Sequence, residues 1–600
     1  MKDSSLNARK RLFFLGCVLF TTILMGAYGF YLIDGPAHPS TLVYRSVQLF
    51  NLESGAVAGE VPLPLELARW LAPLSLAGGL IVAALTYFKG HFDRWRACRL
   101  RGHHIICGLG GKGSALAADL LSKGLKVVAL DPQPAADDLE RFRKMGGLHF
   151  PITAAESNEW NNVGVRRAAT FTAVTPIDAC NLAMAMKVER VCASASRVSG
   201  GFSTLRIFAH IGSVSYRDRL DRNSFLGTVP HRNCTIRSFN IHANLARVLF
   251  RRFPLETAGY SDGAVNITRS VHLIVPSIGN EAMALLIHSA RIGHYLGGRK
   301  VHFHVIAPSA TTGIKALRTA YPSIDQCCSG LEAIDTDGDD DFGCRAASVI
   351  QAHPGSCFTV FPCVNDSPVN LADILRVHEE VPAEYPFRMP VPAGLRDLLE
   401  PVANQKSLLS SRIEWIPGIS AFCGEESVFN GRLDQIALSI HENWREETER
   451  QIRDATSDGE LSRVRLLREK PTFKPWDACT EEQKDSSRSQ ADHLMLKIRA
   501  AKLDPSIVSS TQWLDWCIGN PESLELLARV EHERWAAHLW LAGWTSGLKR
   551  DDSKKIHNNL IPYDELDEAT QEYDKCACRH LANYVSEIHE LATLGAGPDK

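Results

Sequence analysis

The sequence predicts a multidomain chain with an α-helical membrane part of two spans, two tandem α/β lobes and a mainly α-helical C-terminal module. Three observations support this fold class: two uncharged apolar runs near the N-terminus, a strand, turn and helix pattern that occurs twice, and helical periodicity near the C-terminus. A chain of 600 residues is long enough for several domains. We expect domains at 1–100, 101–255, 265–420, 430–505 and 520–590.

Two apolar runs, Leu12–Ile33 and Leu71–Phe88, contain no charged residue. Each is long enough to cross a hydrocarbon core of about 30 Å as a helix. Basic residues precede the first run and follow the second, so the positive-inside rule predicts that both termini are cytoplasmic. A signal peptide cleaved near Ala27 is the alternative for the first run. We expect a multi-pass protein of the bacterial inner membrane that contacts the lipid bilayer.

Between the runs, Thr41–Leu52 is apolar enough for a short helix that dips into the membrane, within a re-entrant loop at 41–55. This layout resembles two-helix pore domains, which assemble as tetramers around an ion path. A potassium filter reads close to TVGYG, whereas this chain has NLESG at that place. The candidate pore residues are Asn51, Glu53 and Gly55. Glu53 is the candidate for a ring of carboxylates, and a solvated loop position is its alternative.

The first α/β lobe opens with the strand HHIIC, His103–Cys107, followed by the glycines of a GxGxxG turn, Gly108, Gly110 and Gly113. Such a turn lets backbone amides approach a pyrophosphate, and the helix behind it offers its positive N-terminus. Asp131 ends the next apolar run, at the spacing where an acidic residue binds ribose hydroxyls. We therefore expect a Rossmann-like lobe that binds NAD or another adenine nucleotide.

A second pattern lies downstream, in VGVRRAATFTAVTPIDACNLAMAMKV, Val163–Val188. A strand that leads to Asp178 and then Asn181, ahead of a helix, resembles the regulator of potassium conductance (RCK) family, which is related to the Trk potassium uptake regulators. The resemblance implies that the nucleotide is a regulatory ligand and that Asp178 belongs to its binding set. The family's usual GDA after the third strand is missing, where this chain reads FPITAAES.

The strand, turn and helix that open the first lobe recur in VHLIVPSIGNEAMALLIHSA, Val271–Ala290. The segment FTVFPCVNDSPVNLADILRV, Phe358–Val377, resembles the second pattern. Internal repeats of this kind predict a second lobe. Of the glycine set only Gly279 remains, and Ala307 stands at the position that matches the ribose-binding carboxylate. We therefore expect a structural lobe without a nucleotide.

The C-terminal stretch contains HERW, AGWTSG, LIPYDEL and YDK in this order. Together these motifs resemble the ryanodine receptor repeat (RyR domain), a helical module. The resemblance implies six candidate ligand contacts, with packing in the core as the alternative for each: His532, Trp535, Trp544, Arg550, Pro562 and Tyr563. An earlier segment, IALSIHENW at Ile436–Trp444, parallels LARVEHERW and predicts a degenerate partner repeat within 430–505.

Composition and motifs exclude several functions. The formal net charge of -2 gives no field that would attract nucleic acid. The sixteen cysteines show no CxxC pair. The acidic loop Asp335–Ala346 has Asp340 and Ala346 where a calcium loop requires Gly and Glu. Because no hydrolase, metalloprotease or Walker motif occurs, we expect no metal site, no catalytic residue and no enzymatic activity.

Together, these patterns predict a homotetrameric, ligand-gated cation channel, with potassium as the first candidate ion. A nucleotide in the RCK-like lobes would gate it, and the RyR module would be a second sensor. One alternative is a membrane-anchored NAD-dependent oxidoreductase, for which His210 and His242 are available without a clear role. Another is a non-conducting, membrane-anchored nucleotide sensor or scaffold.

Overall fold

The computed structural model describes the chain from residue 2 to residue 594 with internal gaps. The described residues are 2–52, 60–152, 160, 163–193, 204–222, 234–258, 269–337, 342–362, 371–405, 407–455, 457, 465 and 467–594. Within the helices, the side chains of 2–12, 14–15, 81–91, 193, 221–222, 404–405, 407 and 591–594 are not described.

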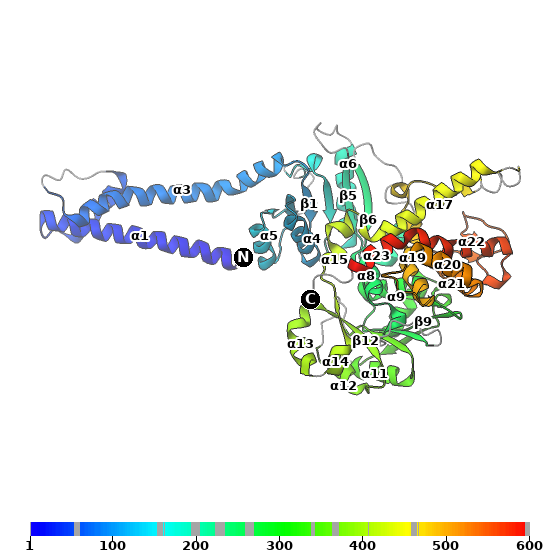
Figure 1. Ribbon diagram of the computed structural model, residues 1–600. Coiled ribbons are helices and arrows are strands. Elements are labelled where there is room, and N and C mark those ends of the chain that lie inside the picture. The colour runs from blue at the N-terminus through cyan, green and yellow to red at the C-terminus, as the bar shows by residue number, and fades with distance from the viewer. Residues whose placement is uncertain are drawn as a thin grey trace.

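A helical hairpin forms the N-terminal part and projects from the rest of the molecule (Figure 1). Its elements are α1 (Lys2–Asp34), α2 (Pro39–Gln48), η1 (Leu49–Asn51) and α3 (Leu63–Arg99). A Cβ atom at Gly29 of α1 would lie 2.5 Å from Leu65 Cβ, so this glycine permits close packing of α1 against α3. The helix predicted between the apolar runs is present as α2 and η1.

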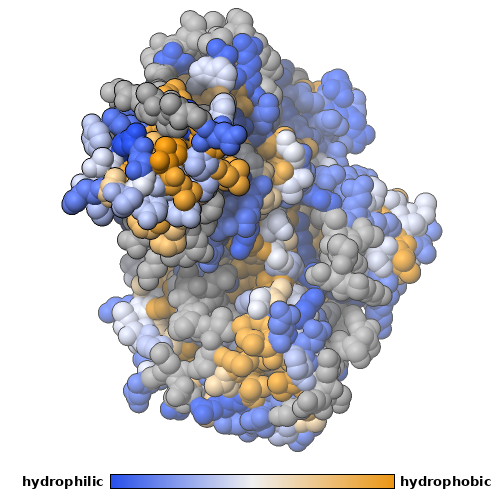
Figure 2. Space-filling model, turned by 90° about the vertical axis from the view of Figure 1, so that its left-hand side faces the viewer, coloured by the Kyte–Doolittle hydropathy of each residue, from blue (hydrophilic) through white to orange (hydrophobic). Residues whose placement is uncertain are grey.

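Among the described side chains, one helical segment is long and apolar enough to cross a membrane. It is Gly16–Asp34, with a mean hydropathy of 1.7, and only 22% of its apolar window is buried. The second predicted span overlaps residues 81–91, whose side chains lie outside the described set, and it stays a prediction. The hairpin exposes large apolar side chains, among them Phe20 and Trp70. Figure 2 views the molecule from the side of the hairpin tip and shows hydrophobic patches on that face.

The first lobe contains a parallel sheet of six strands in the order β3-β2-β1-β4-β5-β6. Its apolar strands are buried on both faces by helices, which is the usual environment of a parallel sheet. The elements are β1 (His104–Cys107), α4 (Gly111–Ser122), β2 (Val127–Leu130), α5 (Ala136–Lys144), β3 (Leu148–Phe150), η3 (Val165–Arg167), β4 (Thr170–Ala173), α6 (Asp178–Ala193), β5 (Leu205–His210), α7 (Val214–Arg222), β6 (Cys234–Phe239), α8 (Ile241–Arg252) and η4 (Leu255–Thr257).

The second lobe repeats this topology. Its main strand order, β10-β9-β7-β11-β12-β13, places the strands as in the first lobe, and a short β8 pairs with β9. The elements are β7 (Val271–Val275), α9 (Asn280–Ile292), β8 (His294–Tyr295), β9 (Arg299–Ala307), α10 (Ala310–Ala320), η5 (Ile324–Gln326), β10 (Gly330–Asp335), α11 (Phe342–Ala352), β11 (Cys357–Val360), α12 (Leu371–Glu380), β12 (Phe387–Pro392), η6 (Ala393–Leu395), α13 (Arg396–Gln405), α14 (Ser407–Arg412) and β13 (Ile413–Ile416).

The C-terminal region is mainly helical. Its elements are α15 (Ser420–Cys423), α16 (Glu425–Val428), η7 (Arg432–Asp434), α17 (Gln435–Asp454), η8 (Trp476–Ala478), α19 (Glu481–Ala500), α20 (Ser510–Gly519), α21 (Pro521–Leu541), β14 (Thr545–Ser546), β15 (Ile556–His557), η9 (Tyr563–Glu565), α22 (Glu568–Arg579), η10 (His580–Tyr584) and α23 (Val585–Leu594). Tandem parallel-sheet lobes followed by a mainly helical region are thereby confirmed.

Two parts of the C-terminal region share one local geometry. The Nε2 atom of His441 on α17 lies 2.8 Å from the carbonyl oxygen of Lys474, two residues before η8. The Nε2 atom of His532 on α21 lies 2.8 Å from the carbonyl oxygen of Ile561, two residues before η9. In each case a ring N–H fastens the first helix to the turn that precedes the next helix.

The hairpin joins the first lobe directly. Four residues, 100–103, connect the end of α3 to β1. Ala97, in the last turn of α3, is fully buried in the lobe core with Trp160 and Val163. The buried His103 ring lies 2.9 Å from the Val163 carbonyl oxygen. The end of α3 is therefore a packed part of the lobe.

Candidate functional site

The glycine turn after β1 has the shape that close approach of an anion requires. Gly108 has φ +97°, a conformation that favours glycine. A Cβ atom on Gly113 would lie 1.9 Å from the Gly108 carbonyl oxygen. Gly110 is the N-cap of α4, and a Cβ atom there would meet nothing within 4 Å. The open N-terminus of α4 therefore faces a space beside the turn, as an anion-binding helix end does.

Replacement of Gly113 by alanine is expected to damage this turn. The Gly108 amide donates to the Leu130 carbonyl oxygen at 2.9 Å, which restrains the turn against the sheet. Overpacking of this kind costs about 1–3 kcal/mol. Because the turn must leave its binding shape to relieve the strain, affinity for NAD or ATP should fall by about 5- to 150-fold. Nucleotide titration followed by fluorescence checks this, with Gly394→Ala in the second lobe, where a Cβ atom meets nothing within 4 Å, as the control that should bind like wild type. Equal affinity of the two variants would contradict the expectation.

Asp131 stands beside the glycine turn. Its Oδ2 accepts from the Leu109 amide at 2.6 Å, and its Oδ1 accepts from the Gln133 amide at 2.8 Å. These bonds fix the carboxylate at the edge of the cradle, the space bounded by the glycine turn and the N-terminus of α4. Because a carboxylate has about four acceptor positions, both oxygens keep capacity for further donors such as ribose hydroxyls.

Asp178 is the first residue of α6, directly after the loop that follows the neighbouring strand β4. Its two oxygens accept from the amides of Gly212 and Ser213, at 2.7 and 3.0 Å. The fully buried Asn181 bonds to Thr175 in the same loop and to the His210 carbonyl oxygen. The contacts observed for Asp178 thus order two loops, and its contact with a ligand stays a prediction.

Three side chains beside the cradle could not be assigned from the sequence. Lys112 Nζ, in the first turn of α4, lies 3.2 Å from His242 Nε2 on α8. His210 is buried, and neither ring nitrogen has a hydrogen-bond partner within the described residues. Burial, followed by the charges of Lys112 and His242, holds the pKa of His210 well below its usual value. On its other side His242 lies 3.9 Å from Glu281 of α9, so the second lobe borders the cradle.

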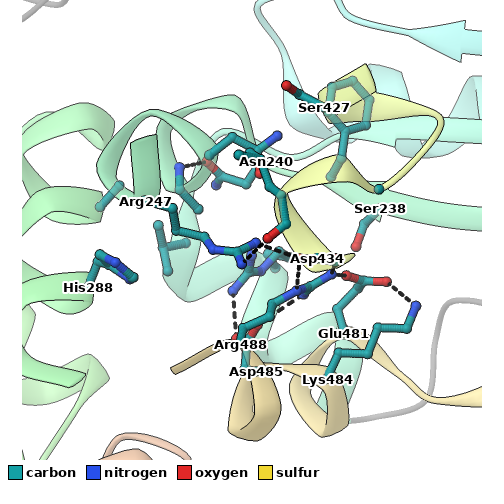
Figure 3. A pocket seen from close by; sticks show the side chains of 18 of the residues that line it. Ser238, Asn240, Arg247, His288, Ser427, Asp434, Glu481, Lys484, Asp485 and Arg488 are labelled. Carbon is teal, nitrogen blue, oxygen red and sulfur yellow. Dashed lines mark hydrogen bonds and ion pairs between the residues drawn. The ribbon is translucent and has the colours of Figure 1, made fainter. Parts of the chain in front are cut away.

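A cavity of about 110 Å³ lies where the two lobes meet the helical region. Its charged lining comes from α7, β6, α8, α9, η7 and α19. Figure 3 shows Arg247, Asp434 and Asp485 among these residues. Arg247 of α8 donates to Asp434 and to Asp492 at 2.5 and 2.8 Å. Asp485 of α19 accepts from Arg291 of the second lobe at 3.0 Å and from Arg217 of the first lobe at 3.3 Å. Helix α19 is therefore bonded to both lobes.

The acids of this cavity are ionised despite their burial. Burial raises the pKa of Asp492 and of Glu481, but the neighbouring cationic side chains outweigh it and lower both to about 2. For Asp434 and Asp485 the same balance places the pKa further below the usual range. The arrangement is a compensated ion network, which can hold domains in one orientation.

In the RyR-like segment, His532 is a buried anchor. Its Nδ1 lies 3.2 Å from Asp574 Oδ2, while Nε2 faces the Ile561 carbonyl oxygen. Burial lowers its pKa, but the hydrogen bond and charge of Asp574 outweigh this and raise the pKa above its usual value. Both ring nitrogens are thus engaged inside the protein.

Three of the other candidate residues of this segment, Trp535, Trp544 and Arg550, contact His557. The rings of Trp535 and Trp544 lie 5.0 and 6.0 Å from the ring of His557. Arg550 lies over Trp544 at 5.7 Å and donates to Asp552 at 2.6 Å. Tyr563 is buried at the start of η9, whose N-cap is Pro562. Both tryptophans are half-buried, so an aromatic surface remains open to solvent beside a buried core.

Of the candidate pore residues, the structure describes one. Asn51 is exposed at the end of η1, where Leu52 turns back with φ 61°. Glu53 and Gly55 lie outside the described residues. The pore assignment therefore stays a prediction.

Comparison with protein families identifies two segments. Residues 104–220 match the TrkA-N domain. Residues 520–588 match the RyR domain. These matches confirm the Trk-type lobe and the RyR domain that the sequence predicts. No curated protein matches the chain.

Among solved structures, the chain is similar to several forms of the GsuK channel. A GsuK mutant is 14% identical, with a TM-score of 0.33, over 70% of this chain and 96% of that chain. GsuK bound to NAD is 11% identical, with a TM-score of 0.28, over 68% and 86%. GsuK bound to ADP is 13% identical, with a TM-score of 0.26, over 62% and 93%. These likenesses are too weak to assign a function.

Proposed function

We propose that the chain is one subunit of a homotetrameric, nucleotide-gated cation channel in the inner membrane. The observation that carries this proposal is the direct connection between α3 and β1. Only residues 100–103 separate the helix from the strand that leads into the glycine turn. Since Ala97 is buried in the lobe core, a change in the shape of the lobe would move the end of α3.

The surface of the hairpin supports a membrane location. Its exposed apolar residues include Phe20, Leu24, Trp70 and Leu74, with between 53% and 67% of each residue accessible. Large apolar side chains exposed together on one hairpin indicate contact with a membrane or a partner. The core helix of a soluble protein would be mostly buried, whereas α1 is not.

The nucleotide would act as a ligand that shifts an equilibrium. Its pyrophosphate would bind at the N-terminus of α4, and its ribose would bind at Asp131. To open the pore, the ligand must bind one lobe arrangement more tightly than the other, because equal affinity shifts nothing. The RyR domain, with Trp535 and Trp544 half-exposed, would be a second sensor.

Ion flux through the purified protein in liposomes tests this function. Potassium, sodium and calcium flux would be measured with and without NAD, NADH, ATP and ADP-ribose. We expect cation flux that changes on nucleotide addition. Nucleotide binding without flux under any condition would exclude the channel.

The short connection between α3 and β1 gives a sharper test of the proposed gating. Four flexible residues inserted after Arg101 should leave nucleotide binding unchanged and remove the effect of the nucleotide on flux, because the lobe would no longer hold the end of α3. The same insertion after Ile507, which is 74% exposed between α19 and α20, should leave both unchanged. Flux that still follows the nucleotide in the Arg101 insertion would contradict mechanical coupling through this segment.

Two other functions have specific observations in their favour. NLESG departs from a potassium filter, which favours a non-conducting membrane-anchored sensor or scaffold. Such a protein would be a monomer or dimer in detergent. Lys112 and His242 beside the glycine turn favour an NAD-dependent oxidoreductase, and cofactor turnover by the purified protein would reveal it.

A further inference from the structure

Four histidines and a glutamate gather on one face of the second-lobe sheet. His272 of β7 is in register with His302 of β9, and Glu332 of β10 is in register with His304 of β9. Alternate residues of a strand face the same side, so the side chains of His302 and His304 project together. His353, just after α11, adds its ring to the group, 4.8 Å from His272.

Three of these residues have the spacing of metal ligands. Nε2 of His302 lies 2.9 Å from Glu332 Oε1, and Nδ1 of His304 lies 3.1 Å from Glu332 Oε2. One ligand atom from each of the three lies within 4.8 Å of the others. Metal bonds of about 2.0–2.1 Å in a tetrahedral zinc site place ligand atoms about 3.3 Å apart. The group needs little rearrangement to enclose such an ion.

The surroundings hold the ligands in place. His304 is fully buried, and its ring stacks on that of His302 with centroids 4.6 Å apart. Gly330 makes room for this stack, because a Cβ atom there would lie 2.3 Å from the His302 ring. The Glu332 side chain is 51% exposed, so an ion can reach the group from solvent.

The hydrogen bonding of His304 is incomplete in a way that a cation would satisfy. Its Nε2 lies 3.0 Å from His272 Nδ1. Its buried Nδ1, although close to Glu332, makes no hydrogen bond. If Nε2 carries the proton, the lone pair of Nδ1 faces a carboxylate, and two acceptors at this distance repel unless a cation lies between them.

We propose that His302, His304 and Glu332 bind a divalent transition-metal ion, with zinc as the reference ion, and that His272 positions His304 through their shared hydrogen bond. Imidazole with one carboxylate is a ligand set that suits zinc and its neighbours. His302 and His304 lie in the middle of β9 and His272 lies near the start of β7, whereas Gly279 belongs to the turn that follows the end of β7. The site is therefore separate from the glycine turns and gives the second lobe a ligand of its own.

Zinc binding by the full-length protein in detergent tests the proposal. After chelator treatment, zinc would be titrated in competition with a chromophoric chelator, and cobalt would be followed by its visible absorption. We expect one site per chain that binds zinc and gives cobalt a tetrahedral spectrum. Thermal unfolding of the wild type should shift upward with zinc, because a ligand that binds the folded state stabilises it.

Glu332→Gln is the informative variant, because its half-exposed position lets the fold persist without the charge. Its zinc affinity should fall by at least about tenfold, while its unfolding temperature without metal should equal that of wild type. Glu140→Gln, at an exposed glutamate of the first lobe, is the matched control and should bind zinc like wild type. His304→Gln should abolish the cobalt spectrum. Absence of zinc binding by the wild type, or equal affinity in Glu332→Gln and wild type, would overturn the proposal.

Discussion

Replacement of Asp492 by alanine should lower the free energy of unfolding by about 3–5 kcal/mol, the cost of removing one partner from a buried ion pair. Asp492 accepts from Arg247 at 2.8 Å and from Arg251, and its side chain is 1% exposed. Without it, two guanidinium groups stay buried next to fewer counter-charges. Denaturant or thermal unfolding of the purified protein measures the loss.

Asp477 provides the control. It accepts from Arg237 at 2.6 Å, but its side chain is 80% exposed. A solvent-exposed pair contributes only about 0–1 kcal/mol, so Asp477→Ala should unfold almost like wild type. If Asp477→Ala lost as much free energy of unfolding as Asp492→Ala, burial would not be the reason for the large effect at Asp492.

The low pKa of the Asp492 carboxylate predicts that the stability of the protein depends on pH. The folded pKa of Asp492, about 2, is below the value of about 4 in the unfolded chain. Its contribution is therefore complete above about pH 4 and disappears as the pH falls toward 2. The difference in stability between wild type and Asp492→Asn should narrow over this interval. A difference that is constant from pH 7 to pH 3 would exclude this titration.

Replacement of Gly110 by aspartate should reduce nucleotide affinity more than 100-fold. A carboxylate about 5 Å from a phosphate, at an effective dielectric constant of about 20, costs about 3 kcal/mol. The fold should persist, because a Cβ atom at Gly110 meets nothing within 4 Å and its φ is -76°. Calorimetric titration with NAD and ATP gives the affinities.

Gly110→Asn separates charge from size, since it has nearly the same shape without the charge. It should retain affinity to within about tenfold of wild type if repulsion is the cause. Loss of binding in both variants would assign the effect to shape. Wild-type affinity in Gly110→Asp would show that the nucleotide does not bind at this turn.

The parts of the site that the sequence predicts are those encoded locally. The glycines and Asp131 lie within one strand, turn, helix and strand, and their order alone implies the geometry of the turn. The motifs of the RyR domain are equally local. The helix between the apolar runs follows from hydropathy and length.

The remaining features depend on contacts between distant segments. Arg217 and Asp485 are 268 residues apart in sequence, and no local pattern pairs them. The alternation His302, Phe303, His304 is visible in the sequence, but Glu332 and His272 join it only through strand register. Local ligand spacing in the sequence therefore predicts no metal site, because the proposed ligands lie on two strands that meet only in the folded sheet.

The two helical units that share the histidine-to-turn contact have different neighbours. Helix α19, in the first unit, carries Asp485 and Asp492, whose carboxylates are committed to partners in the lobes. The second unit keeps Trp535 and Trp544 at a surface open to solvent. Sequence variation should accordingly be tightly restricted along the inward face of α19 and freer around the two tryptophans.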